Sequence, residues 1–264
     1  MSTLTEWLAE LPAYVLFLGF AAIGIGLTLT ADLVFRRRMQ EGTRTEAGRT
    51  AAIMLGVLAN IYAVLIAFVI VQGWGNLQQA QTYVDSQATA MSEIRENSKV
   101  LGVRDAVPID VALKGYARSV IDDDLPSMES HGRRSPETTV ALQHLYATVR
   151  QVTPKGPPEV AFYNQMVDRL DTIVVARQAA VTASEGSLPA PLYLLLGLGG
   201  AIVVALACVL DSKHRQSHVI IVCSIAVVIA FMLAIVVSFD HPFTGSLKVS
   251  DRPIVEFLES PSSP

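Results

Sequence analysis

The sequence has few of the residues that form disulfides, bind metals or catalyse reactions. Its two cysteines, Cys208 and Cys223, both fall in long apolar runs, so no disulfide framework is predicted. Its five histidines are scattered, and no CxxC or HExxH spacing occurs. A GxSxG elbow and a phosphate-binding glycine loop are also missing. We therefore expect no enzyme, no metal, no cofactor and no nucleic-acid partner.

Charge is also scarce. Charged residues make up 17% of the chain and hydrophobic residues 51%, which is too apolar for a soluble domain of 264 residues. Formal charge is absent from four runs of about the length that a helix needs to cross hydrocarbon. They are Ala13–Ala31, Ala51–Gly73, Pro191–Leu210 and Val219–Phe239. Buried helices of soluble proteins seldom run so long without a charge, so we predict four transmembrane helices.

Basic residues predict the orientation of these helices. No Lys or Arg precedes the first run, which contains no signal-peptide pattern, whereas Glu6 and Glu10 do precede it. The two short loops carry the basic residues Arg36, Arg37, Arg38, Arg44, Arg49, Lys213 and Arg215. Cytoplasmic loops are rich in Lys and Arg, so both termini and the long middle segment are predicted outside the bacterial inner membrane.

The predicted fold is all-α, with four transmembrane helices and a helical extramembrane bundle inserted between the second and third. Its expected parts are residues 1–73 with helices 1 and 2, 74–188 as the extramembrane domain, 189–239 with helices 3 and 4, and 240–264 as a turn and tail. Apolar residues repeat in a heptad pattern after the second run, and no Gly or Pro interrupts residues 76–101. The second membrane helix should therefore continue outward as one rod.

Three more helices are expected in the middle segment. One spans Pro108 to about Asp124, and the stretch after it, with three consecutive aspartates, is interpreted as a solvated turn rather than a cation site. Ser135 can cap the next helix, which should run to about Val152. The last continues to about Gly186. Its expected core residues are Tyr163, Met166, Leu170, Ile173, Val174 and Val181.

Small and polar residues stand out in the membrane runs. Ala22, Gly26 and Thr30, and likewise Gly197, Ala201 and Ala205, recur at a spacing of four, which favours close helix packing. An asparagine in hydrocarbon needs a partner or water, so Asn60 marks either an interhelical hydrogen bond or a wet pathway. Our candidate pore-lining residues are Asn60, Gln72 and Asn76.

Three stretches resemble the bestrophin-like domain family of bacterial integral membrane proteins, a domain of unknown function. They are "FDHPFTGSLKVS", "NIYAVLIAFVIVQGWGNLQQAQTYVDSQATAMSEI" and "ARQAAVTASEGSLPAPLYLLLGLGGAI". In that family an aspartate, Pro-Phe and a glycine close the last helix, although His241 stands here where the family often has arginine. The kinship to bestrophins, which are oligomeric anion channels, is an analogy of fold.

The closing turn is the most specific part of the resemblance. Asp240 and His241 should end the fourth helix, Pro242 should prevent its continuation, and Gly245 should permit a tight turn. Phe243 completes the motif. The turn is interpreted as a structural clasp, with a gate as the alternative.

The resemblance and the polar residues of the second helix together predict a homo-oligomeric ion channel that conducts anions and contacts the lipid bilayer. A non-conducting sensor or scaffold, whose external bundle binds a partner, is one alternative. A cation channel is the other, because the external segment is slightly acidic.

Overall fold

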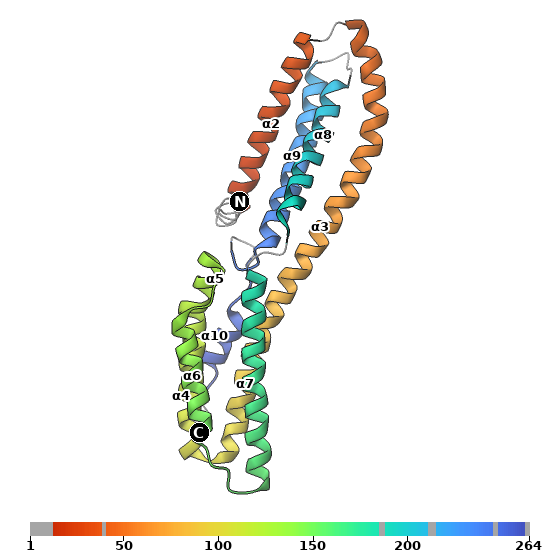
Figure 1. The fold of residues 1–264 in the computed structure, drawn as a ribbon. Coiled ribbons are helices and arrows are strands. Elements are labelled where there is room, and N and C mark those ends of the chain that lie inside the picture. Colours follow the sequence, from red (N-terminus) through yellow and green to blue (C-terminus); the bar gives the residue numbers. More distant parts are fainter. Residues whose placement is uncertain (1–12, 39–40, 185–187, 211–214, 245–247, 262–264) are drawn as a thin grey trace. The chain divides into compact units, whose positions relative to one another are not determined.

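The computed structural model describes residues 13–38, 41–184, 188–210, 215–244 and 248–261, and these ranges contain no strand. The all-α prediction is therefore confirmed (Figure 1). The elements are α2 (Ala13–Arg38), α3 (Glu41–Ser98), the 3₁₀ turn η1 (Lys99–Leu101), α4 (Val103–Ser119), the π-helix η2 (Val120–Asp124), α5 (Leu125–His131), α6 (Pro136–Arg150), α7 (Pro157–Ser184), α8 (Ala190–Val209), α9 (Arg215–Asp240) and α10 (Arg252–Glu259).

Among the described residues, three helices are long and apolar enough to cross a membrane. They are α8, the part of α9 from Gln216 to Asp240, and α3, whose apolar segment lies in the part of the helix that begins at Gly48. The first predicted span lies in α2, where the apolar stretch is Phe17–Thr30.

The chain divides into two compact units, which we describe separately. Unit 1 contains α2, α3 up to Gly75, α8 and α9, and unit 2 contains α3 from Asn76, α4 to α7, His241–Thr244 and the segment from Lys248 that includes α10. Within unit 1, α2 packs on both α8 and α9. A separate cluster joins the membrane part of α3 to those two helices, with Tyr62, Ile66, Val69, Leu196, Val203 and Val236 at its centre.

Helix α3 extends for 58 residues without a break, as the uninterrupted heptad pattern predicts. The heptad residues of its second half form one side of the unit 2 core. Ala80, Val84, Met91 and Ile94 are almost fully buried there. Burial of this apolar stripe therefore explains why α3 remains helical through unit 2.

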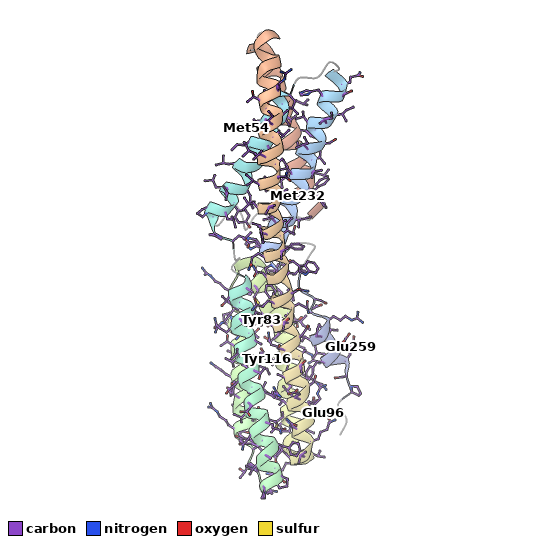
Figure 2. The ribbon with its side chains drawn as sticks, turned by 90° about the vertical axis from the view of Figure 1, so that its right-hand side faces the viewer. Met54, Tyr83, Glu96, Tyr116, Met232 and Glu259 are labelled. Carbon is purple, nitrogen blue, oxygen red and sulfur yellow. The ribbon has the colours of Figure 1, made fainter. Side chains whose placement is uncertain are left out.

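Among the described residues of unit 2, the four long helical segments of α3, α4, α6 and α7 form a bundle with a definite order of neighbours. The Tyr116 hydroxyl of α4 donates to Gln87 of α3 at 2.9 Å, and α4 packs along α6. Tyr146 of α6 donates to Asp171 of α7, and an ion pair joins α7 back to α3. The order α3–α4–α6–α7 places α4 and α7 at opposite corners. Figure 2 shows the side chains between these helices, with Tyr83 and Tyr116 labelled.

Two predicted boundaries in unit 2 are wrong. Helix α4 begins at Val103, five residues before the expected start, and therefore contains Pro108 in its interior. Gly102, with a φ of 84°, starts it, because its carbonyl accepts the Asp105 and Ala106 N–H groups. The stretch interpreted as a turn is helical, as η2 and α5, and ends only at Gly132, whose φ is 59°.

The capping prediction for α6 is confirmed. The Ser135 hydroxyl accepts the Thr138 N–H, and Pro136 occupies the first turn. The stripe predicted for α7 is confirmed at Met166, Leu170, Ile173 and Val181, which are buried. Tyr163 is only partly buried, and Val174 is exposed.

Candidate functional site

The candidate pore residues lie on α3. Asn60 and Gln72 are exposed on unit 1, and Asn76, the first residue of unit 2, is half-buried. At 100° per residue, Gln72 lies about 120° around the helix from Asn60, so the two share no single line along it. The structure thus places both side chains on the outside of the single chain, at different angles.

Asn60 stands in an apolar surface. Its exposed neighbours one to three turns along α3 are Val57, Val64, Phe68 and Val71, and Phe68 is 71% exposed. A lone amide on such a face of a membrane helix is costly unless water or another helix meets it. This face of α3 is therefore incomplete in the isolated chain.

The predicted clasp residue Asp240 is buried at the end of α9 and joins it to the start of α8. One carboxylate oxygen accepts the Leu188 N–H at 2.8 Å, and the other accepts the Tyr193 hydroxyl at 2.6 Å. All three residues belong to unit 1. By accepting these two hydrogen bonds, the buried Asp240 carboxylate links the end of α9 to the start of α8.

The residues after Asp240 belong to unit 2. The Val249 N–H donates to the Pro242 carbonyl at 2.8 Å, and Phe243 is buried in the unit 2 core together with Val249. The Thr244 N–H donates to the His241 carbonyl, which closes a turn. Gly245, the last residue of the predicted clasp, lies outside the described residues.

Replacing Asp240 by alanine should destabilise the protein by about 2–4 kcal/mol, because two half-buried donors lose their charged acceptor. Tyr193→Phe removes one of the two bonds and should cost less. The measurement is the thermal midpoint of the detergent-solubilised protein. Asp122→Ala, at an exposed aspartate, is the matched control and should change the midpoint little. Equal midpoints for Asp240→Ala and the control would contradict this role.

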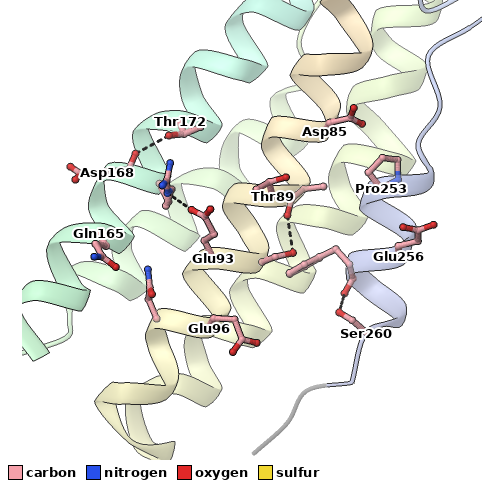
Figure 3. Close-up of a pocket in the computed structure, with 15 residues that line it drawn as sticks. Asp85, Thr89, Glu93, Glu96, Gln165, Asp168, Thr172, Pro253, Glu256 and Ser260 are labelled. Carbon is pink, nitrogen blue, oxygen red and sulfur yellow. Dashed lines mark hydrogen bonds and ion pairs between the residues drawn. The ribbon is translucent and has the colours of Figure 1, made fainter. Parts of the chain in front are cut away.

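Unit 2 contains an open groove of about 950 Å³ (Figure 3). Residues of α3, α7 and the α10 region line it, and Figure 3 shows α3 between the other two. Its charged lining residues are Asp85, Glu93, Glu96, Asp168, Arg169 and Glu256. Arg169 pairs with Glu93, Lys99 with Glu96 and Arg252 with Glu256, so Asp85 and Asp168 leave the groove with a modest net negative charge. Such a surface attracts cations and repels anions.

Unit 2 contains a buried ion pair that the sequence interpretation missed. Arg177 of α7 binds both oxygens of Asp124, at 2.7 and 2.8 Å, and the two side chains are 4% and 1% exposed. Asp124 also accepts the Ser135 N–H at 2.9 Å. The last of the three consecutive aspartates is therefore part of the core, which corrects the prediction of a solvated turn.

Burial affects a second polar group beside this pair. Desolvation raises the pKa of the Tyr116 phenol, Arg177 lowers it and Asp124 raises it, with a net upward shift. The phenol therefore stays protonated throughout the physiological range and keeps its hydrogen bond to Gln87.

One sequence signal did point to the buried pair. Arg177 continues the apolar stripe of Met166, Leu170 and Ile173, and a charge on a core stripe needs an opposite charge within the core. A second buried arginine, Arg95, similarly ties α3 to the C-terminal segment. It pairs with Asp110 at 2.7 Å and donates to the Phe257 carbonyl, with its guanidinium over the Phe257 ring.

Long apolar helices combined with a charged helical unit define an integral membrane protein of helical type. The Bestrophin-like domain model matches residues 22–254, and the chain belongs to this family. No curated protein matches the chain.

Solved structures share the fold across nearly the whole chain. A bacterial bestrophin homolog from Klebsiella pneumoniae matches at a TM-score of 0.73 and 12% identity, covering 92% of this chain and 97% of the other. A second variant of that homolog matches at 0.71 and 10% identity, covering 92% and 99%. The family that the quoted motifs resemble is thus confirmed.

Proposed function

We propose that this chain forms a homo-oligomeric ion channel in the bacterial inner membrane. The observation that carries the proposal is the Bestrophin-like domain over residues 22–254, which includes α3 with its exposed, incomplete membrane face. In an oligomer that face meets either a neighbouring chain or a water-filled pathway. Either one would supply hydrogen-bond partners for the Asn60 amide.

We propose four membrane spans, with α2 as the first. Three helices meet the length and hydropathy that a span requires, and Phe17–Thr30 supplies the apolar part of the fourth. The basic residues of the two short loops support a cytoplasmic location for those loops, and hence external termini and an external unit 2.

The pathway residues that we propose are Asn60, Gln72 and Asn76, all on α3. Asn60 and Gln72 are exposed, as a pathway formed between chains requires. Asp240, His241, Pro242 and Phe243 form a structural clasp, because their contacts lie within the two units rather than on an open surface.

Two ion preferences have support from different observations. The kinship implied by the family name favours anions, and we retain anion conduction as the first candidate. The acidic groove of unit 2 favours a cation channel, because its carboxylates would concentrate cations near any pathway that it borders.

The deciding experiment is ion flux into liposomes that contain the purified protein, with chloride, potassium and sodium gradients imposed in turn. Chloride flux would support the first candidate, and sodium or potassium flux the second. No flux of any ion from a folded oligomer, across pH and voltage, would instead favour a scaffold whose unit 2 binds a partner.

Replacing Asn60 by leucine should change the conductance or the selectivity of that flux without abolishing assembly, because the substitution removes an amide from an apolar face. Single-channel recording in planar bilayers measures both quantities. Ser224→Leu, which removes an exposed hydroxyl from α9, is the matched control and should leave currents unchanged. Currents that Asn60→Leu leaves unaltered would remove Asn60 from the pathway.

A further inference from the structure

Unit 2 presents two exposed helix faces that its own core does not use. The outer face of α4 and the outer face of α7 each repeat at helical spacing. The α4 face consists of Val107, Val111, Gly115 and Arg118. The α7 face consists of Val160, Asn164, Asp168 and Asp171. Val107 and Val111, one turn apart on the α4 face, are 53% and 62% exposed, and Val160 on the α7 face is 42% exposed.

These two faces point in opposite directions. Helices α4 and α7 occupy opposite corners of the bundle, because α3 and α6 each lie between them. When two different patches lie on opposite sides of a chain, one patch of the first copy can bind the other patch of the next copy. Such head-to-tail contacts close into a ring when the rotation between copies permits.

The buried ion pair gives a common reference level for the two helices. Asp124 and Arg177 are in contact, and α4 with η2 and α7 run toward them in the same direction. Arg118 lies six residues before Asp124, and Asp171 lies six residues before Arg177. Val107 lies seventeen residues before Asp124, and Val160 lies seventeen residues before Arg177.

The paired positions are chemically complementary. Arg118 on the α4 face is level with Asp171 on the α7 face, and Val107 is level with Val160. Rotation about an axis along these helices keeps every residue at its level, so the α4 face of one copy would meet the α7 face of the next in this register. A two-fold dimer whose axis also runs along the helices would instead place Arg118 opposite Arg118, or Asp171 opposite Asp171, and like charges repel.

We infer that the α4 face of one copy docks on the α7 face of a second copy of this chain. Val107 packs against Val160 at one end of the contact, and Arg118 forms an ion pair with Asp171 at the other. This inference rests on the proposed homo-oligomer and adds to it the surface through which unit 2 assembles.

Cysteine cross-linking of the full-length protein in detergent tests the register. In a background with Cys208→Ala and Cys223→Ala, Val107→Cys and Val160→Cys are placed on the same chain and oxidised with copper–phenanthroline. A ladder of cross-linked species is expected. Val107→Cys with Val175→Cys is the matched control, because those positions differ in level by fifteen residues, or about 22 Å, and should not cross-link.

A charge swap tests the polar end. Arg118→Asp should reduce the yield of the Val107–Val160 cross-link about tenfold, because it opposes Asp171 with a like charge. Adding Asp171→Arg should restore the yield. Tyr146→Phe removes the hydrogen bond within the chain to Asp171 and should leave the yield unchanged.

Light scattering on the same samples separates this inference from the proposed function. An oligomer that gives no Val107–Val160 cross-link would overturn the docking surface and leave the homo-oligomer intact. A strictly monomeric protein would overturn both. Cross-linked dimers from Val107→Cys alone would show that the α4 face pairs with itself, and would also overturn the inference.

Discussion

Arg177→Met should lower the stability of the protein by about 3–5 kcal/mol, because it leaves the carboxylate of Asp124 buried without its cation. The same change removes the Arg177 bonds to the Ser135 carbonyl and the Thr139 hydroxyl, at 3.1 and 3.2 Å. The expected result is a thermal midpoint lower by roughly 10 °C in detergent, together with faster amide hydrogen exchange in α6 and α7.

The matched control is the same substitution at an exposed arginine. Arg169 pairs with Glu93 on the surface of the groove, where both side chains are more than 40% exposed, so Arg169→Met should cost less than about 1 kcal/mol. Similar losses for the two variants would show that burial of the Arg177 pair contributes little. Asp124→Leu combined with Arg177→Met should recover part of the loss, though not the Asp124 bond to the Ser135 N–H.

The second large effect is expected in unit 1, where α8 packs closely against Tyr62 of α3. A Cβ on Gly199 would lie 2.8 Å from the Tyr62 ring, and a Cβ on Gly200 would lie 2.9 Å from Ile229 and 3.1 Å from the Tyr62 hydroxyl. Gly199→Ala with Gly200→Ala should therefore destabilise unit 1 by about 2–5 kcal/mol, since each methyl group forces packed neighbours apart.

A control within α8 separates packing from helix propensity. A Cβ on Gly197 would meet none of the described residues within 4 Å, so Gly197→Ala should be neutral or stabilising by up to about 1 kcal/mol. Tyr62→Ala should relieve the clash in the double variant, and a double-mutant cycle on thermal midpoints measures that coupling. Additive effects of Tyr62→Ala and the glycine changes would contradict direct contact.

Local sequence patterns accounted for much of the helical structure. The long charge-free runs predicted apolar helices, and the heptad pattern predicted the unbroken course of α3 and its buried residues Val84 and Met91. Ser135 and Pro136 marked the start of α6. These features depend on residues a few positions apart, which is why a linear pattern contains them.

The close helix contacts within unit 1 involve other glycines than those that the spacing of four singled out. The spacing of four singled out Gly26 and Gly197, yet a Cβ on either would have no described residue within 4 Å, whereas Gly199 and Gly200 face Tyr62. Small residues permit close approach, but the rotation of each helix about its axis decides which of them face a neighbour.

The sequence by itself determined the all-helical class, the apolar runs and the family, because each depends on composition or on short motifs. Only the tertiary structure decided that Asp124 is buried against Arg177, 53 residues away, and that the acidic groove forms between α3, α7 and α10. It also decided which faces of α4 and α7 are exposed. Contacts between distant segments depend on how the helices pack together, and no local pattern specifies that packing.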